Sequence, residues 1–146
     1  MNRWLLDTNV LSELRKQRPE PEVTTFIASQ PLERLFLSSV TFAEIRFGIE
    51  KLADPSRRAE ITSWLDNILR PMFDQRVLAL SEDVLLTWRL IIEVGRKNGH
   101  TFSHPDVLIA ATAFHHNLVV VTRNTSEFIA AGVTVLNPWT GETFAA

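Results

Sequence analysis

Three acidic residues and one amide occupy positions from which a parallel sheet would bring them together. Asp7 directly follows an apolar run at 4–6, and Asn124 comes two residues after a second apolar run. Glu44 and Asp106 each fall in the first turn of an expected helix. In open parallel sheets, ligands bind outside the carboxyl ends of the strands, where helix N-termini gather. We therefore expect these four side chains to converge at one edge of a sheet.

The chemistry of such a cluster follows from its charge. Two carboxylates about 4 Å apart repel each other by about 4 kcal/mol at an effective dielectric constant of about 20. Three of them therefore persist together only if they bind a cation or take up protons. Oxygen ligands without His or Cys favour Mg²⁺ or Mn²⁺, and ions held in this way activate water for attack on phosphate esters. Asp7, Glu44 and Asp106 are thus candidate ligands of such an ion.

Each of these positions also has a purely structural explanation. A Ser, Thr or Asn followed three residues later by an acid is typical of a helix capping box. Acids in a first helical turn gain a few tenths to about 1 kcal/mol from the helix dipole. Spacing alone leaves the structural and the chemical interpretations open. The capping pairs are Thr41 with Glu44, Ser103 with Asp106, and Asn124 with Glu127, and Asp7 by itself is a candidate N-cap.

The elements that must position these residues alternate between short apolar strands and longer helices. Strands that are apolar throughout and separated by helices indicate a mainly parallel sheet covered on both faces. We expect a single domain over 1–146 with a three-layer α/β/α fold. The expected strands are 4–6, 35–38, 77–80, 118–122 and 133–136. The expected helices are 8–16, 23–29, 41–52, 55–69, 81–97 and 103–116, with one or two further turns after Asn124.

Composition excludes several classes of protein. The 146 residues are 45% hydrophobic and 22% charged, which argues against disorder and for a folded core. There is no cysteine, so disulfide frameworks, thiolate catalysis and cysteine-bound metals are excluded. The net charge of −2 lacks the basic excess that is usual in nucleic-acid-binding proteins. We see neither a secretory signal nor an apolar run long enough to span a membrane, and therefore expect a cytoplasmic protein that does not contact membranes.

Four separated segments resemble PIN-domain ribonucleases, especially the VapC-type toxins and their FitB-like branch. The segments are 5–13 (LLDTNVLSE), 37–48 (LSSVTFAEIRFG), 105–113 (PDVLIAATA) and 121–124 (VTRN), the last followed by Phe128. The stretch 137–139 (NPW) resembles the ending of the FitB-like members. The resemblance covers nearly the whole chain, and four motifs in the same order are far more specific than any one of them.

The resemblance implies a PIN fold, usually dimeric, and Mg²⁺- or Mn²⁺-dependent endoribonuclease activity on RNA. It implies a cognate antitoxin that blocks the active site and carries a DNA-binding domain, so that DNA is contacted only indirectly. Asp7, Glu44 and Asp106 match the metal-binding acids of the family. Asn124 falls where many members carry a fourth acid; its amide coordinates through oxygen or holds a water but supplies no charge. That difference favours a site with one metal ion at rest.

The same resemblance suggests roles for individual residues. Asp7 and Asp106 are expected to hold the ion, while Glu44 completes its shell or orients the attacking water. The catalytic set is thus Asp7, Glu44, Asp106 and Asn124. Thr8 and Thr122 are expected to position waters, and Arg123 to meet a phosphate. The cations expected to line a path for the RNA backbone are Arg15, Lys16, Arg18 and Arg46.

Other interpretations of the sequence remain. A strand ending in Asp and Thr also suggests a haloacid dehalogenase-like phosphatase, but the second acid of that motif is replaced by Asn9. A further alternative is a PIN-like binding module without catalytic activity. The uncharged Asn124, in place of an acid, is the feature that suggests it. The His100–His104 and His115–His116 pairs give weak support to a zinc site. An apolar groove for an antitoxin helix is expected around Trp64, Leu65 and Ile68.

Overall fold

The computed structural model describes residues 2–146 and is built around one six-stranded sheet. The strand order is β3-β2-β1-β4-β5-β6. Neighbouring strands run parallel except β5 and β6, which pair antiparallel. The strands are β1 (Trp4–Leu6), β2 (Leu35–Ser38), β3 (Val77–Leu78), β4 (Val119–Val121), β5 (Val135–Leu136) and β6 (Thr143–Phe144). The mainly parallel sheet expected from the sequence is confirmed, and β6 is an addition to it.

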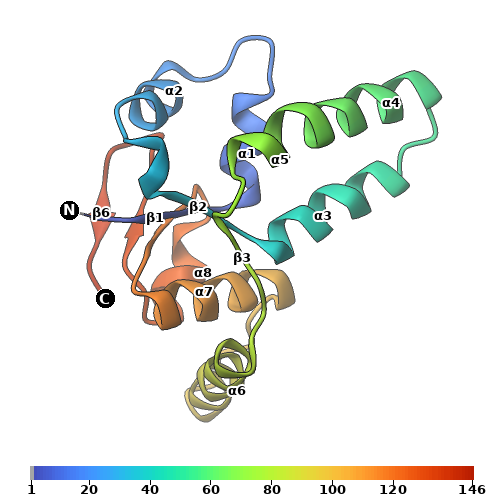
Figure 1. Cartoon of the computed structure of the whole chain (residues 1–146). Coiled ribbons are helices and arrows are strands. Elements are labelled where there is room, and N and C mark those ends of the chain that lie inside the picture. Colours follow the sequence, from blue (N-terminus) through green and yellow to red (C-terminus); the bar gives the residue numbers. More distant parts are fainter. Residues whose placement is uncertain (1) are drawn as a thin grey trace.

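Helices cover both faces of this sheet and complete the three layers (Figure 1). Helices α1 and α2 lie over one face, and α7 and α8 lie over the other, with α6 packed outside α7. Helices α3 and α4 form a pair that extends away from the sheet (Figure 1). The helices are α1 (Thr8–Leu14), α2 (Pro21–Ala28), α3 (Ser39–Glu50), α4 (Pro55–Trp64), α5 (Arg70–Met72), α6 (Glu82–Lys97), α7 (His104–His116) and α8 (Thr125–Ala130).

Alternation along the central strands divides the core into two clusters, one on each face. In β1, Trp4 and Leu6 pack with the helices on one face, whereas Leu5 packs with those on the other. In β4, Val121 packs on the same face as Trp4 and Leu6, whereas Val120 packs on the same face as Leu5. Successive side chains of a strand point to opposite faces, so a strand buried on both faces must be apolar at every position. This explains why β1 and β4 show no polar alternation in the sequence.

The helix expected at 55–69 is longer and less regular than predicted. Helix α4 passes into a π-helical turn, Leu65–Leu69, and then into α5, which contains Pro71. Proline has no N–H to donate to the carbonyl four residues earlier and its ring crowds that carbonyl. The wider π turn lies directly before the proline, where the regular α-helical hydrogen-bond pattern is interrupted. Pro71 therefore does not end the helical segment, contrary to the prediction.

Among residues 2–146, no helix is both long enough and apolar enough to cross a membrane.

Candidate active site

The predicted site residues lie at the carboxyl ends of the central strands. Asp7 follows β1 directly, and its backbone N–H donates to the carbonyl of Val121 at the end of β4, at 3.0 Å. Asn124 precedes α8, just after β4. Asp106 is the third residue of α7, and Glu44 lies in α3, which follows β2. The four segments thus reach the same edge of the sheet, as the sequence predicted.

A chain of hydrogen bonds joins three of the four. The Thr122 hydroxyl donates to Oδ2 of Asp7 at 2.7 Å and accepts from the backbone N–H of Asn124 at 3.0 Å. The side-chain amide of Asn124 then donates to Oδ2 of Asp106 at 2.7 Å. Asp7 and Thr122 are both buried. This chain links the two aspartates through one hydroxyl and one amide.

Asn9 also belongs to this network and was not predicted as a site residue. Its Nδ2 donates to Oγ1 of Thr122 at 3.1 Å and lies 3.4 Å from Oδ2 of Asp7. Its Oδ1 accepts from the backbone N–H of Arg123 at 3.3 Å. Asn9 therefore fastens α1 to the segment after β4. The signal in the sequence is the amide two residues after Asp7, within the segment 5–13 that resembles the PIN-domain family.

Burial and neighbouring negative charge both act on the aspartates. Burial raises the pKa of Asp7 to about 6, against the lowering effect of hydrogen bonds from Thr122 and Thr8. The charges of Asp106 and Glu44 make a smaller contribution to the same rise. The pKa of Asp106 is also raised, chiefly by burial, against the lowering effect of hydrogen bonds from Ser103 and Asn124. A bound cation would offset both the cost of burying these carboxylates and the repulsion between them, so these oxygen donors fit a divalent ion.

Glu44 stands somewhat apart from the aspartates. Its charge influences the pKa of Asp7, which places it in the same electrostatic environment. Within residues 2–146, however, no three acidic or histidine side chains are grouped closely enough to hold a metal ion as they stand. The structure therefore brings Asp7 and Asp106 into one network and leaves Glu44 near it without joining it.

The capping explanation for Glu44 is wrong. Helix α3 begins at Ser39, with Ser38 as its N-cap, and the Ser38 hydroxyl accepts from the backbone N–H of Val40 at 3.1 Å. Thr41 is a buried residue inside the helix, and its hydroxyl has no hydrogen-bond partner among the described residues. Glu44 consequently lies beyond the first turn, where capping does not account for it.

The other two capping pairs also differ from the prediction. Ser103 and Asn124 are the N-cap residues of α7 and α8, but neither side chain accepts a hydrogen bond from its own helix. Asn124 instead binds Asp106, and Glu127 accepts from the backbone N–H of Ser103. For Asp7 the structural role holds, because its Oδ1 accepts from the backbone N–H of Thr8 at 2.8 Å.

Several of the cations expected to contact RNA already have partners in the protein. Lys16 pairs with Glu13 at 2.8 Å, and the Arg15 guanidinium lies 5.8 Å from the centre of the Trp64 ring. The Arg123 guanidinium similarly stacks on Trp139. Arg46 is exposed and, together with Arg70, lines a polar cavity of about 350 Å³ on the α3–α4 pair. The path for the RNA backbone stays a prediction, and Arg46, which follows Glu44 by two residues, is the exposed cation of this set closest to that acid in sequence.

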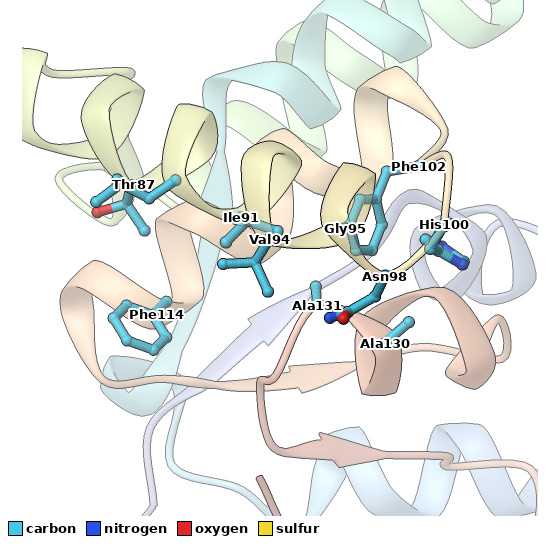
Figure 2. A pocket seen from close by; sticks show the side chains of 11 residues that line it. Thr87, Ile91, Val94, Gly95, Asn98, His100, Phe102, Phe114, Ala130 and Ala131 are labelled. Carbon is cyan, nitrogen blue, oxygen red and sulfur yellow. The ribbon is translucent and has the colours of Figure 1, made fainter.

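A more apolar cavity lies away from the acids. It has a volume of about 440 Å³ and lies between α6, α7 and α8 (Figure 2). Val94, Phe102 and Phe114 contribute to its walls, and none of the four predicted catalytic residues does. The cavity is therefore a packing or contact feature separate from the candidate active site.

Comparison with known proteins gives a consistent result. A family model described as the PIN domain matches residues 4–132. VapC ribonuclease Y4jK of Sinorhizobium fredii is 38% identical over 92% of this chain and 96% of its own length. Toxin FitB of Neisseria gonorrhoeae is 37% identical over 92% of this chain and 97% of its own.

Similarity in three dimensions agrees with this result. The crystal structure of FitAcB from Neisseria gonorrhoeae superposes with a TM-score of 0.88 at 37% identity. The match covers 93% of this chain and 98% of that one. The sheet edge that gathers the acids, the family match and the fold similarity together show that this chain belongs to the PIN-domain family.

Proposed function

We propose that this protein is the toxin of a toxin–antitoxin system and acts as a divalent-metal-dependent endoribonuclease. The observation that carries the proposal is the buried Asp7, linked through Thr122 and Asn124 to Asp106. Relatives named as a VapC ribonuclease and as toxin FitB support the activity and the biological role. Burial, together with the negative charges of Asp106 and Glu44, raises the pKa of Asp7 and supports a bound cation at this site.

Each residue of the site has its own proposed role. Asp7 and Asp106 would hold Mg²⁺ or Mn²⁺, and Glu44 would complete the ligand set or orient the attacking water. When bound, the ion supplies a water of lowered pKa and positive charge for the phosphate. Thr122 holds the Asp7 carboxylate through its hydroxyl, and Asn124 holds Asp106 through its amide. Because Asn124 carries no charge, the site favours one bound ion at rest.

The proposed antitoxin has a suitable surface on the α2 side of the sheet. Trp64 and Ile68, together with Leu14, Ile27 and Met72, line an apolar cavity of about 380 Å³. Ile68 is 52% exposed, whereas Leu65 is buried and does not take part in the lining. An amphipathic antitoxin helix would bury its apolar face in such a groove. The DNA contact of the complex would belong to the antitoxin.

This surface can be tested with the purified toxin and its antitoxin. Binding is expected to slow hydrogen exchange around Trp64 and Ile68, and the Ile68→Asp variant is expected to lose affinity. The Ile129→Asp variant, on α8 at the opposite face of the sheet and 44% exposed, is the matched control. Unchanged exchange around Trp64 with a formed complex would place the antitoxin elsewhere.

A homodimer is the second proposed assembly. Leu86, Leu90 and Val94 follow one another at helical spacing on α6, and each is 58% exposed. Phe114 of α7 is 61% exposed and lines the same cavity as Val94 (Figure 2). An exposed apolar surface of this kind is typical of a contact between subunits. Light scattering of the purified chain would give twice the monomer mass, and Leu90→Lys would reduce it to that of a monomer.

The activity is tested by incubating the purified chain with total bacterial RNA in Mg²⁺, Mn²⁺ or EDTA. We expect discrete internal cuts that require metal and that disappear in Asp106→Asn. Asp54→Asn is the matched control, because Asp54 is an exposed N-cap of α4 and Asn caps equally well. Retained RNA or antitoxin binding without cuts would favour a non-catalytic module. Equal cutting by wild type and Asp106→Asn would contradict the assigned site.

A further inference from the structure

The start of α7 must be fixed for Asp106 to face the site, but α7 does not fix it alone. The Ser103 side chain, at the N-cap, accepts no hydrogen bond from the helix that it begins. The preceding turn contains His100 and Phe102, with Phe102 against Gly95 of α6 (Figure 2). The Ser103 side chain instead hydrogen-bonds to the Asp106 carboxylate, so the backbone of the N-cap is left to be held by another element.

That element is α8, through the Glu127 carboxylate. Oε1 of Glu127 accepts from the backbone N–H of Ser103 at 2.5 Å, across 24 positions of sequence. Oε2 lies 3.5 Å from Nε2 of His100. Only 18% of the Glu127 side chain is exposed, whereas its two partners, Ser103 and His100, lie closer to the surface. One carboxylate thus contacts both ends of the turn that leads into α7.

Helix α8 holds the start of α7 at two points. Asn124, before its first residue, donates to Asp106, and Glu127, in its first turn, binds Ser103. Ser103 and Asp106 are also three residues apart, at the beginning of α7. Two rigid helical turns are therefore joined by two hydrogen bonds. Without the Glu127–Ser103 bond, α8 would hold the start of α7 only through the side-chain contact between Asn124 and Asp106, so the backbone that carries Asp106 would be free to shift.

We propose that Glu127 is a positioning residue: by its hydrogen bond to Ser103 it holds the start of α7 so that Asp106 stays aligned with Asp7. The inference rests on the proposed function, because alignment matters for metal binding. In this role Glu127 acts through the length of its side chain, which brings its oxygen to the Ser103 amide; its charge acts separately, by helping to raise the pKa of Asp106, for which burial is the larger cause. Glu127 is therefore not a replacement for the fourth acid of the family, at whose position this chain has the uncharged Asn124.

Two conservative variants separate the effect of side-chain length at position 127 from the effect of its charge. Glu127→Gln keeps an oxygen at the same distance and removes the charge, whereas Glu127→Asp keeps the charge and shortens the side chain. We would measure Mn²⁺ affinity of the full chain by calorimetry, with Glu142→Asp as an exposed matched control. Residues that orient metal ligands typically contribute about 10-fold to 100-fold to metal affinity. We expect a loss in that range for Glu127→Asp and less than about threefold for Glu127→Gln, since the hydrogen bond remains.

A second readout follows the hydrogen bond itself. The Ser103 amide is expected to exchange slowly in wild type and Glu127→Gln, and faster in Glu127→Asp. Equal Mn²⁺ affinity in all the variants, or a larger loss in Glu127→Gln, would overturn the proposal. If wild type bound no Mn²⁺, the proposed function would fail instead. Even in that case, faster exchange of the Ser103 amide in Glu127→Asp than in wild type would support the positioning contact, and equal exchange in the two proteins would overturn it.

Discussion

Asp7→Asn should make the protein more stable at neutral pH while removing its activity. The folded protein raises the pKa of Asp7 from 3.8 to about 6. Between these two values the folded state binds more protons than the unfolded state, so its stability falls as pH rises through this window. Above it the full cost of the ionised side chain remains, about 3 kcal/mol at 1.36 kcal/mol per tenfold change in proton affinity. Below pH 3.8 the cost is absent.

Asparagine removes the charge and keeps the shape, but it changes one hydrogen bond. Oδ2 of Asp7 accepts from Thr122, whose hydroxyl already accepts from Asn9 and Asn124. A side-chain NH₂ in this position would meet an oxygen that is already occupied, at a cost of about 1 kcal/mol. The net expectation at pH 7 is therefore a gain of about 2 kcal/mol, which becomes a loss of about 1 kcal/mol near pH 3.5.

The assay is urea unfolding of wild type and Asp7→Asn between pH 3.5 and 8, with EDTA present. The difference between the two free energies of unfolding should rise with pH and level off above about pH 7. Asp54→Asn, which alters an exposed cap, should show no comparable rise. A difference that is independent of pH, or a variant less stable than wild type at pH 7, would refute the reasoning. Added Mg²⁺ should stabilise wild type and not Asp7→Asn.

Three further substitutions probe the surroundings of the site. Asn124→Asp places a second carboxylate where an amide now donates to Asp106 at 2.7 Å. The variant should unfold at a lower temperature in EDTA and should bind Mg²⁺ more tightly than wild type. Equal melting temperatures in EDTA would contradict this. Thr122→Val leaves buried polar groups without their partner, so its free energy of unfolding in urea should fall by about 1–3 kcal/mol; an unchanged value would contradict the hydroxyl's role. Gly95→Ala would bring a Cβ within 2.5 Å of the Phe102 ring, and thermal unfolding should show a loss of about 1–3 kcal/mol, whereas no loss would mean that the ring moves freely.

The general position of the site was predictable from the sequence because local patterns determine it. Apolar runs at 4–6 and 118–122 indicated central strands, and the carboxyl ends of parallel strands necessarily share one edge. Asp7 follows the first run directly and Asn124 comes two residues after the second, so their place did not depend on exact helix boundaries. The fold class followed from the same alternation of apolar strands and helices.

The contacts within the site were not predictable, because they depend on competition between similar local signals. Ser38, Ser39 and Thr41 all offer a hydroxyl to begin α3, and the strand pairing that buries Ser38 decides in its favour. The pairing of Glu127 with Ser103 joins residues whose spacing in the sequence carries no pattern. A capping box predicted within one helix became a contact between two helices.

The central claim is that the two linked aspartates hold a divalent cation. The most direct test is a crystal of the protein soaked in Mn²⁺, with diffraction recorded at a wavelength where manganese scatters anomalously. The account predicts one anomalous peak in direct contact with carboxylate oxygens of Asp7 and Asp106. A peak bound only by other residues, or no peak in a protein whose RNA cleavage requires Mn²⁺, would contradict it.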